Sequence, residues 1–148
     1  MAINVSSQPT RCNCTAIRKA ARHMTRFYDA CLAEVDLRGT QYIILRALSA
    51  HGRMTINALA ETMVMDRTTV THNVKPLQRD GLVAIEIDPE DRRSRIVSLT
   101  KTGVARVHQG EAAWAKAQAQ FESRFGQTRA REMRELMSEV TDTELSAE

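Results

Sequence analysis

Residues 66–83 read DRTTVTHNVKPLQRDGLV, and this stretch predicts a capped helix with one buried side. Asp66 is a typical N-cap, and the helix is expected to run to about Arg79, where Asp80-Gly81 ends it. Pro76 removes one backbone donor near that end and is expected to kink the last turn. The apolar side chains recur with the spacing of one helix face: Val70, Val74 and Leu77.

The opposite face of this helix carries hydrogen-bond donors. At about 100° per residue it presents Thr68, Thr71, His72 and Lys75, with Arg67 at its start. No acidic residue occurs between Arg67 and Gln78. Compact donors of this kind suit base edges and phosphates, so we predict that this face enters a nucleic-acid groove. The alternative is an ordinary solvated face, which more usually shows pairs of Glu and Lys.

The flanking segments complete a motif. Before the helix, Thr40 is expected to cap a helix that Gly52 ends, and Thr55 to cap a short helix over residues 56–63. After it, the β-rich runs LVAIEI and RIVSL flank the polar segment of residues 88–94, which predicts a hairpin with a charged tip. Helix, turn, helix and hairpin describe a winged helix-turn-helix, whose second helix lies in the major groove.

The hairpin tip supplies a second set of basic side chains. Its arginines are candidates for DNA contact, because a guanidinium on a narrow hairpin can enter the minor groove: Arg92, Arg93 and Arg95. Asp91 is predicted to support this wing by holding an arginine guanidinium in a bidentate pair. Taken alone, the segment is equally typical of a solvated charged turn.

The two ends of the chain predict long amphipathic helices. Apolar residues recur at three and four from Ile17 to Val35. Thr100 is expected to cap a long helix to about Arg124, and Thr128 to restart a final helix after Gly126. The expected order is ααααββαα, a mainly α fold with a small β-hairpin wing. The terminal stripes are too wide for one small domain to cover, which favours a two-fold dimer.

Composition excludes several classes. The 148 residues fit one domain, and the net charge of +3 is too small by itself to identify a nucleic-acid binder. No apolar run approaches the about 20 residues that cross a bilayer, and no signal-peptide core is present, so a cytoplasmic protein without membrane contact is expected. No metal-ligand spacing, phosphate loop or catalytic motif occurs, which predicts no metal, no cofactor and no enzyme activity.

Taken together, these segments resemble one family. Residues 66–83, the wing of residues 88–95 and the exit Leu99-Thr100-Lys101-Thr102-Gly103 are similar to the MarR family of transcriptional regulators, and the resemblance covers about residues 14–142. It implies a homodimeric winged-helix repressor or, less often, an activator. The family's wing Asp and Arg correspond to Asp91 and Arg93, whereas His72 stands where close relatives often have Arg.

This resemblance divides the chain into functional parts. Residues 1–13 are expected to form a flexible arm, and residues 14–148 a single subunit. Within it, residues 14–38 and 104–142 would supply the dimerisation helices, and residues 40–103 the DNA-binding region. The predicted partners are double-stranded DNA with a pseudo-palindromic operator, a second copy of the chain, and a small effector that releases the DNA. A winged-helix module that binds an acidic protein partner is the alternative from another class.

Two hypotheses concern what such a regulator senses. The resemblance implies a pocket between the dimer helices and the winged domain, often for phenolic or carboxylate ligands. The candidates for effector binding are Arg18, Arg22, His23 and Tyr28, although a solvated basic face and a dimer core explain the same residues. The family's hydroperoxide-sensing branch has a reactive cysteine near the start of the first helix. Cys14 occupies a similar place, with an inert thiol as the alternative.

Overall fold

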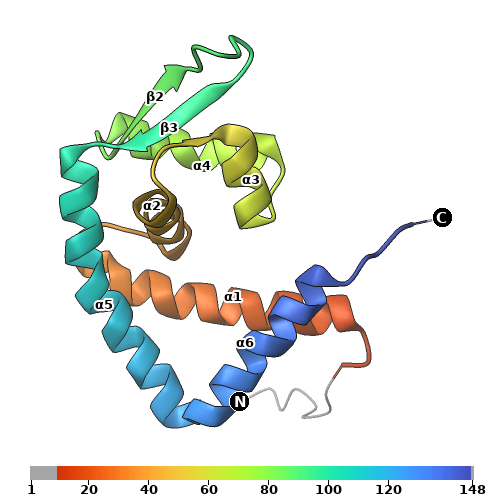
Figure 1. Ribbon diagram of the computed structural model, residues 1–148. Coiled ribbons are helices and arrows are strands. Elements are labelled where there is room, and N and C mark those ends of the chain that lie inside the picture. Colours follow the sequence, from red (N-terminus) through yellow and green to blue (C-terminus); the bar gives the residue numbers. More distant parts are fainter. Residues whose placement is uncertain (1–9, 148) are drawn as a thin grey trace, which may run out of the picture.

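The computed structural model describes residues 10–147, and it is mainly helical with a small antiparallel sheet (Figure 1). The first nine residues of the expected arm lie outside the described range. The elements are α1 (Asn13–Leu32), the 3₁₀ turn η1 (Ala33–Val35), α2 (Gly39–His51), β1 (Met54–Thr55), α3 (Ile56–Met63), α4 (Arg67–Arg79), β2 (Val83–Ile87), β3 (Arg95–Leu99), α5 (Lys101–Phe125) and α6 (Gln127–Asp142). The predicted ααααββαα order is therefore confirmed.

The sheet has one strand more than the sequence predicts. β2 and β3 form the expected hairpin, from the pair Val83 and Leu99 to the pair Ile87 and Arg95. β1 adds two residues on the other side of β3, where Met54 pairs with Val97. Two residues are too short to show the alternation by which a strand is recognised in a sequence. This short strand joins the hairpin to the helix-turn-helix.

The helix starts follow the predicted caps in three cases and differ in two. The side chains of Thr55, Asp66 and Thr100 each accept a backbone N–H three residues on, as predicted. Thr40 does not cap α2, which begins one residue earlier because the carboxylate of Asp29 accepts the Gly39 N–H at 2.6 Å. Thr128 does not cap α6 either, since the backbone turns at Gly126 with φ of 104° and the helix begins directly after it.

The core lies inside the winged unit and beneath α5. It is formed by side chains from α2, α3, α4 and the sheet, including Ile44, Leu45, Leu59, Val70, Val74, Leu77 and Val97, all fully buried. The predicted stripe of α4 is thus confirmed as core. In Figure 1 α5 descends from the wing and α1 packs against it below the winged unit, with α6 folded back from the far end of α5. None of the helices in residues 10–147 has the length and apolarity needed to span a membrane.

A close backbone contact joins the wing to α5. The Leu82 carbonyl accepts the Thr100 N–H at 3.1 Å, and the Thr100 hydroxyl donates to the Gly81 carbonyl at 2.6 Å. The first turn of α5 then lies so close that a Cβ placed on Gly103 would be 2.0 Å from the Leu82 carbonyl oxygen. Further along the same helix, a Cβ on Gly110 would meet the ring of Tyr42 at 2.7 Å. Both glycines let α5 approach the winged unit.

We expect Gly103→Ala to lower the free energy of unfolding by about 3 kcal/mol or more, because backbone atoms cannot yield as a side chain can. Gly81→Ala is the matched control. Gly81 has φ of 73° and open space where a Cβ would lie, so only the left-handed conformation costs energy, about 1–2 kcal/mol. Urea denaturation of both variants measures the difference, and equal losses would contradict the steric explanation.

Candidate nucleic-acid interface and effector cavity

The five predicted groove residues of α4 lie together on one open face. They line a shallow hollow of about 510 Å³: Arg67, Thr68, Thr71, His72 and Lys75. Four of them are exposed and Thr71 is half-buried. The hollow has no acidic lining residue, so its hydroxyls, imidazole and cations are available to a polyanion.

The start of α4 is fixed by its cap. Asp66 accepts the Thr69 N–H at 2.7 Å and the Thr69 hydroxyl at 2.9 Å, and these bonds lower the pKa of the Asp66 carboxyl. The stabilisation that comes with this lowered pKa is present above the ordinary value of an aspartate and is lost as acid protonates the carboxylate. Pro76 does not end the helix, which continues through Arg79. The exposed face of α4 therefore starts from a defined residue.

Asp91 shapes the wing by a contact different from the predicted one. Its carboxylate accepts the backbone N–H of Arg93 at 3.0 Å, while its carbonyl accepts the Ser94 N–H at 2.8 Å. These are the bonds of a β-turn with Asp in first position. Among the described residues, no ion pair joins Asp91 to an arginine. The expected guanidinium pair is thus replaced by a backbone bond, because the turn brings the N–H closer.

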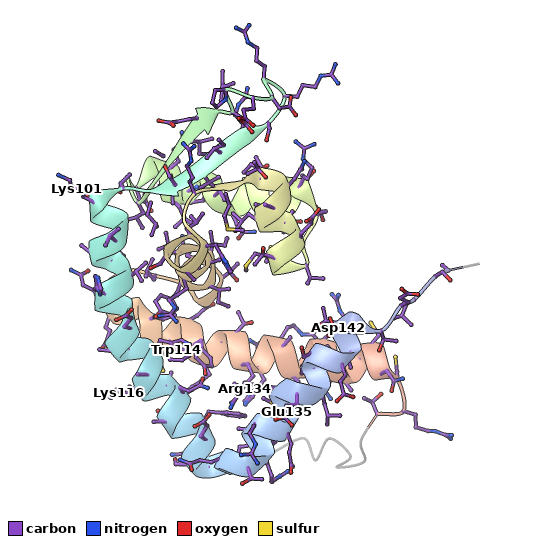
Figure 2. The ribbon with its side chains drawn as sticks, viewed as in Figure 1. Lys101, Trp114, Lys116, Arg134, Glu135 and Asp142 are labelled. Carbon is purple, nitrogen blue, oxygen red and sulfur yellow. The ribbon has the colours of Figure 1, made fainter. Side chains whose placement is uncertain are left out.

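The three wing arginines have different surroundings. Arg95 folds back and donates to the carbonyls of Arg92 and Ser94 at 3.1 and 3.2 Å, so it braces the turn. The guanidinium groups of Arg92 and Arg93 are exposed and have no hydrogen-bond or ion-pair partner within residues 10–147. Long side chains project from the hairpin tip into solvent (Figure 2). Arg92 and Arg93 are therefore the wing cations free to bind a phosphate or a groove.

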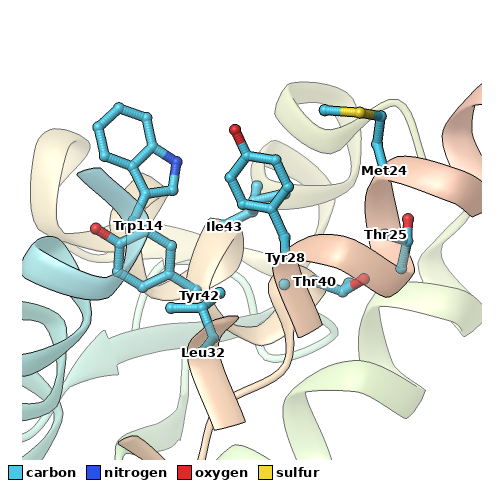
Figure 3. A pocket seen from close by; sticks show the side chains of 9 residues that line it. Met24, Thr25, Tyr28, Leu32, Thr40, Tyr42, Ile43 and Trp114 are labelled. Carbon is cyan, nitrogen blue, oxygen red and sulfur yellow. The ribbon is translucent and has the colours of Figure 1, made fainter. Parts of the chain in front are cut away.

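A cavity of about 260 Å³ lies where α1, α2 and α5 meet (Figure 3). It is lined by Met24, Thr25, Tyr28, Leu32, Gly39, Thr40, Tyr42, Ile43 and Trp114. Of the four predicted effector residues only Tyr28 is among them. Arg18 and Arg22 line an exposed hollow on α1, and His23 lines a separate cavity with Phe121 and Phe125. The four predicted residues therefore do not form one site.

Sequence analysis missed most of this cavity because its walls come from three distant segments. Trp114 and Tyr42 are apolar-seam and core residues by their spacing, and the spacing does not show that a hollow lies between them. Tyr42 is buried against Gly110 as described above, and burial raises its pKa. The one available signal is the clustering of aromatic rings on helices that the predicted fold brings together.

Polar contacts lead from the cavity to α6. The Tyr28 hydroxyl donates to Oε1 of Gln118, whose amide donates to Glu122 at 3.2 Å. Glu122 also accepts from Arg134 of α6 at 3.0 Å, and Figure 2 labels Arg134 on that helix. Burial, and then the nearby Glu122 carboxylate, raise the pKa of Tyr28, so this tyrosine stays protonated at neutral pH. α6 is thus connected to the cavity wall by consecutive hydrogen bonds.

His72 borders two hollows. Besides the face of α4, it lines a polar cleft of about 550 Å³ between α4 and the α1–α2 junction. The other lining residues of that cleft include Asp29, Arg38 and Arg79. One imidazole therefore belongs to both the predicted groove face and the cleft behind it.

The cysteine at the cap of α1 is Cys12 rather than Cys14, the predicted redox residue. The Cys12 thiol accepts the Thr15 N–H at 3.4 Å, and this bond lowers the pKa of Cys12. Cys14 is exposed in the first turn, and Cys31 is half-buried. Tyr28 donates its hydroxyl hydrogen to Gln118, so the pairing of a tyrosine with Cys14 that the redox hypothesis requires is not seen at Tyr28.

A helix-turn-helix, a three-stranded wing and long flanking helices define the winged-helix class of DNA-binding proteins. The chain belongs to the MarR family, whose model matches residues 35–94, from η1 to the wing turn. The resemblance stated from the sequence is thereby confirmed.

Curated relatives and a solved structure agree with this assignment. The organic hydroperoxide resistance transcriptional regulator of Bacillus subtilis is 30% identical over 90 residues, which make up 61% of either chain. The HTH-type transcriptional repressor NicR of Pseudomonas putida is 33% identical over 89 residues, or 60% of this chain and 56% of the relative. The matched part thus spans less than two thirds of these relatives. The M. tuberculosis transcriptional regulator MosR, solved in complex with DNA, is 29% identical with a TM-score of 0.77, covering 90% of this chain and 99% of that one.

The backbone contact of Asp91 makes a distinction between two substitutions. We expect Asp91→Asn to keep DNA affinity close to that of the original chain, because an amide oxygen can still accept the Arg93 N–H. Asp91→Ala should weaken binding by about 1 kcal/mol through a loosened turn. Fluorescence anisotropy with labelled DNA measures both, and an Asn variant as weak as the Ala variant would restore the ion-pair interpretation.

Proposed function

We propose that this protein is a sequence-specific transcriptional regulator, a repressor that binds a pseudo-palindromic operator as a homodimer and is released by a small effector. The observation that carries the proposal is the acid-free hollow on α4, where the five donor and cationic side chains form one exposed surface. The name of the NicR relative and the DNA complex of MosR support it. The protein acts by binding, in keeping with its family.

The proposed complex uses α4 and the wing on neighbouring grooves. The first half of α4, from Arg67 to His72, would face base edges in the major groove, and Lys75 the phosphates. The free guanidinium groups of Arg92 and Arg93 would reach the minor groove beside it. Two copies related by a two-fold axis then place half-sites about 10 base pairs apart.

Changes at the wing and on α4 should act differently. Arg93→Ala is expected to weaken operator binding by about 1–3 kcal/mol with the fold unchanged. His72→Arg should add about one cation to the slope of log affinity against log salt and alter base preference. Anisotropy titrations at several salt concentrations, with operator and scrambled duplexes, measure both effects.

Arg131→Ala is the control for a lost surface cation, because Arg131 lies on α6 in an exposed pair with Glu135. A His72→Arg variant with the original slope and preference would place His72 away from the DNA. Equal affinity for operator and scrambled duplexes would instead favour the protein-interaction module.

The proposed dimer rests on apolar side chains that one chain leaves exposed. On α6 these are Leu136, Met137 and Val140, between 42% and 56% exposed, and Ile17 near the start of α1 is 39% exposed. Such a stripe along a helix is unstable in water unless a partner covers it. A second copy supplies the same stripe, so one two-fold contact would cover both.

We expect the double variant Leu136→Glu with Met137→Glu to sediment as a monomer at micromolar concentration, because four carboxylates would enter the contact. Leu145→Glu is the matched control. Leu145 is 87% exposed beyond the end of α6, so this variant should remain a dimer. An original chain that sediments as a monomer would refute the proposed dimer.

The effector is proposed to bind the cavity between α1, α2 and α5. This position touches both the flanking helices and the winged unit, so a ligand there can favour one relative arrangement of the two. An arrangement that misplaces the two α4 helices for the operator lowers DNA affinity, and by linkage DNA lowers effector affinity equally.

A further inference from the structure

The cavity between α1, α2 and α5 has an uncharged lining. Its nine residues are apolar, aromatic or hydroxyl-bearing, and neither a Lys, Arg or His nor a carboxylate is among them. A carboxylate ligand needs a cation or several free N–H donors to replace its water. Nothing in the lining supplies a cation.

The one helix start at this cavity is already occupied by an anion. Gly39 and Thr40 begin α2 and line the cavity, but the Gly39 N–H donates to the Asp29 carboxylate at 2.6 Å. The Arg38 N–H is likewise used, by the side chain of Gln41 at 3.0 Å. The half-buried charge of Asp29 neutralises the positive end of α2 and repels a second carboxylate.

The remaining polar groups of the wall require both a donor and an acceptor from a ligand. Tyr28 spends its hydroxyl hydrogen on Gln118, so toward the cavity it offers a lone pair and can only accept. Trp114 carries an indole N–H, which can only donate, and in Figure 3 the nitrogen edge of this ring is turned toward Tyr28. A carboxylate satisfies the indole and leaves the tyrosine lone pair facing another lone pair.

We propose that this cavity binds a neutral, single-ring aromatic compound that carries a hydrogen-bond donor beside an acceptor, such as a primary carboxamide or a phenol, and rejects the carboxylate of the same shape. The inference rests on the proposed effector role of the cavity. The volume of about 260 Å³ lies just below the range of drug-sized sites, about 300–1,000 Å³, which suits one ring between Trp114, Tyr28 and Ile43.

The matched probes are benzamide and benzoate, which have the same shape and differ in charge and in the donor. Trp114 is the only tryptophan of the chain and lines the cavity, so its fluorescence reports binding without DNA. At pH 7 we expect benzamide to bind at least about tenfold more tightly than benzoate, because benzoate lacks the donor and meets the Asp29 charge.

Two substitutions separate the causes. Tyr28→Phe should weaken benzamide about fivefold and leave benzoate unchanged, by loss of one hydrogen bond. Asp29→Asn keeps an oxygen for the Gly39 N–H and removes the charge, so it should strengthen benzoate about fivefold and leave benzamide unchanged. Phe121→Leu, in the separate cavity with His23, is the control and should change neither affinity.

Three results would overturn the proposal: benzoate binding as tightly as benzamide, no effect of Tyr28→Phe on benzamide, or no response of Trp114 to either probe at millimolar concentration. Benzoate binding that Arg38→Gln abolishes would also overturn it, by placing the ligand in the adjoining polar cleft that contains Arg38. Operator binding by the ligand-free protein is measured separately, so failure of the regulator function and failure of the ligand class give different results.

Discussion

The carbonyl groups of Gly81 and Leu82 form the joint on which the rest of the molecule depends. They follow the end of α4, precede the first wing strand, and accept both the N–H and the hydroxyl of Thr100 at the start of α5. Because Gly103 has no side chain, α5 can begin in contact with this backbone. The groove helix, the wing and the longest helix therefore share one origin, and their relative angles are set within a few residues.

From this joint α5 carries the geometry of the winged unit to the other helices. Tyr42 packs on it at Gly110, Trp114 closes the cavity, and Gln118 and Glu122 connect Tyr28 to α6. The cavity thus lies along the same helix as the α6 contacts and the wing. A ligand that changes the tilt of α5 acts on both ends, which is the physical requirement for a regulator whose sensing and DNA-binding surfaces are separate.

Local chemistry made much of the fold predictable from sequence. The caps Thr55, Asp66 and Thr100 and the stripe of Val70, Val74 and Leu77 depend on neighbours within one or two turns, and the structure confirms them. The α4 face was predicted residue by residue for the same reason. Features that depend on distant segments were not: Asp29 displaces Thr40 at the start of α2, Asp91 bonds a backbone N–H, and the cavity joins three helices.

His72 has a consequence for how such a protein can change over generations. The same imidazole borders the groove face of α4 and the cleft that contains Asp29 and Arg38. A replacement selected for a new operator sequence also reshapes the cleft behind α4, and one selected for the cleft alters operator choice. The two surfaces cannot drift independently at this position, so the target genes and the internal geometry of the protein are under a common selective constraint.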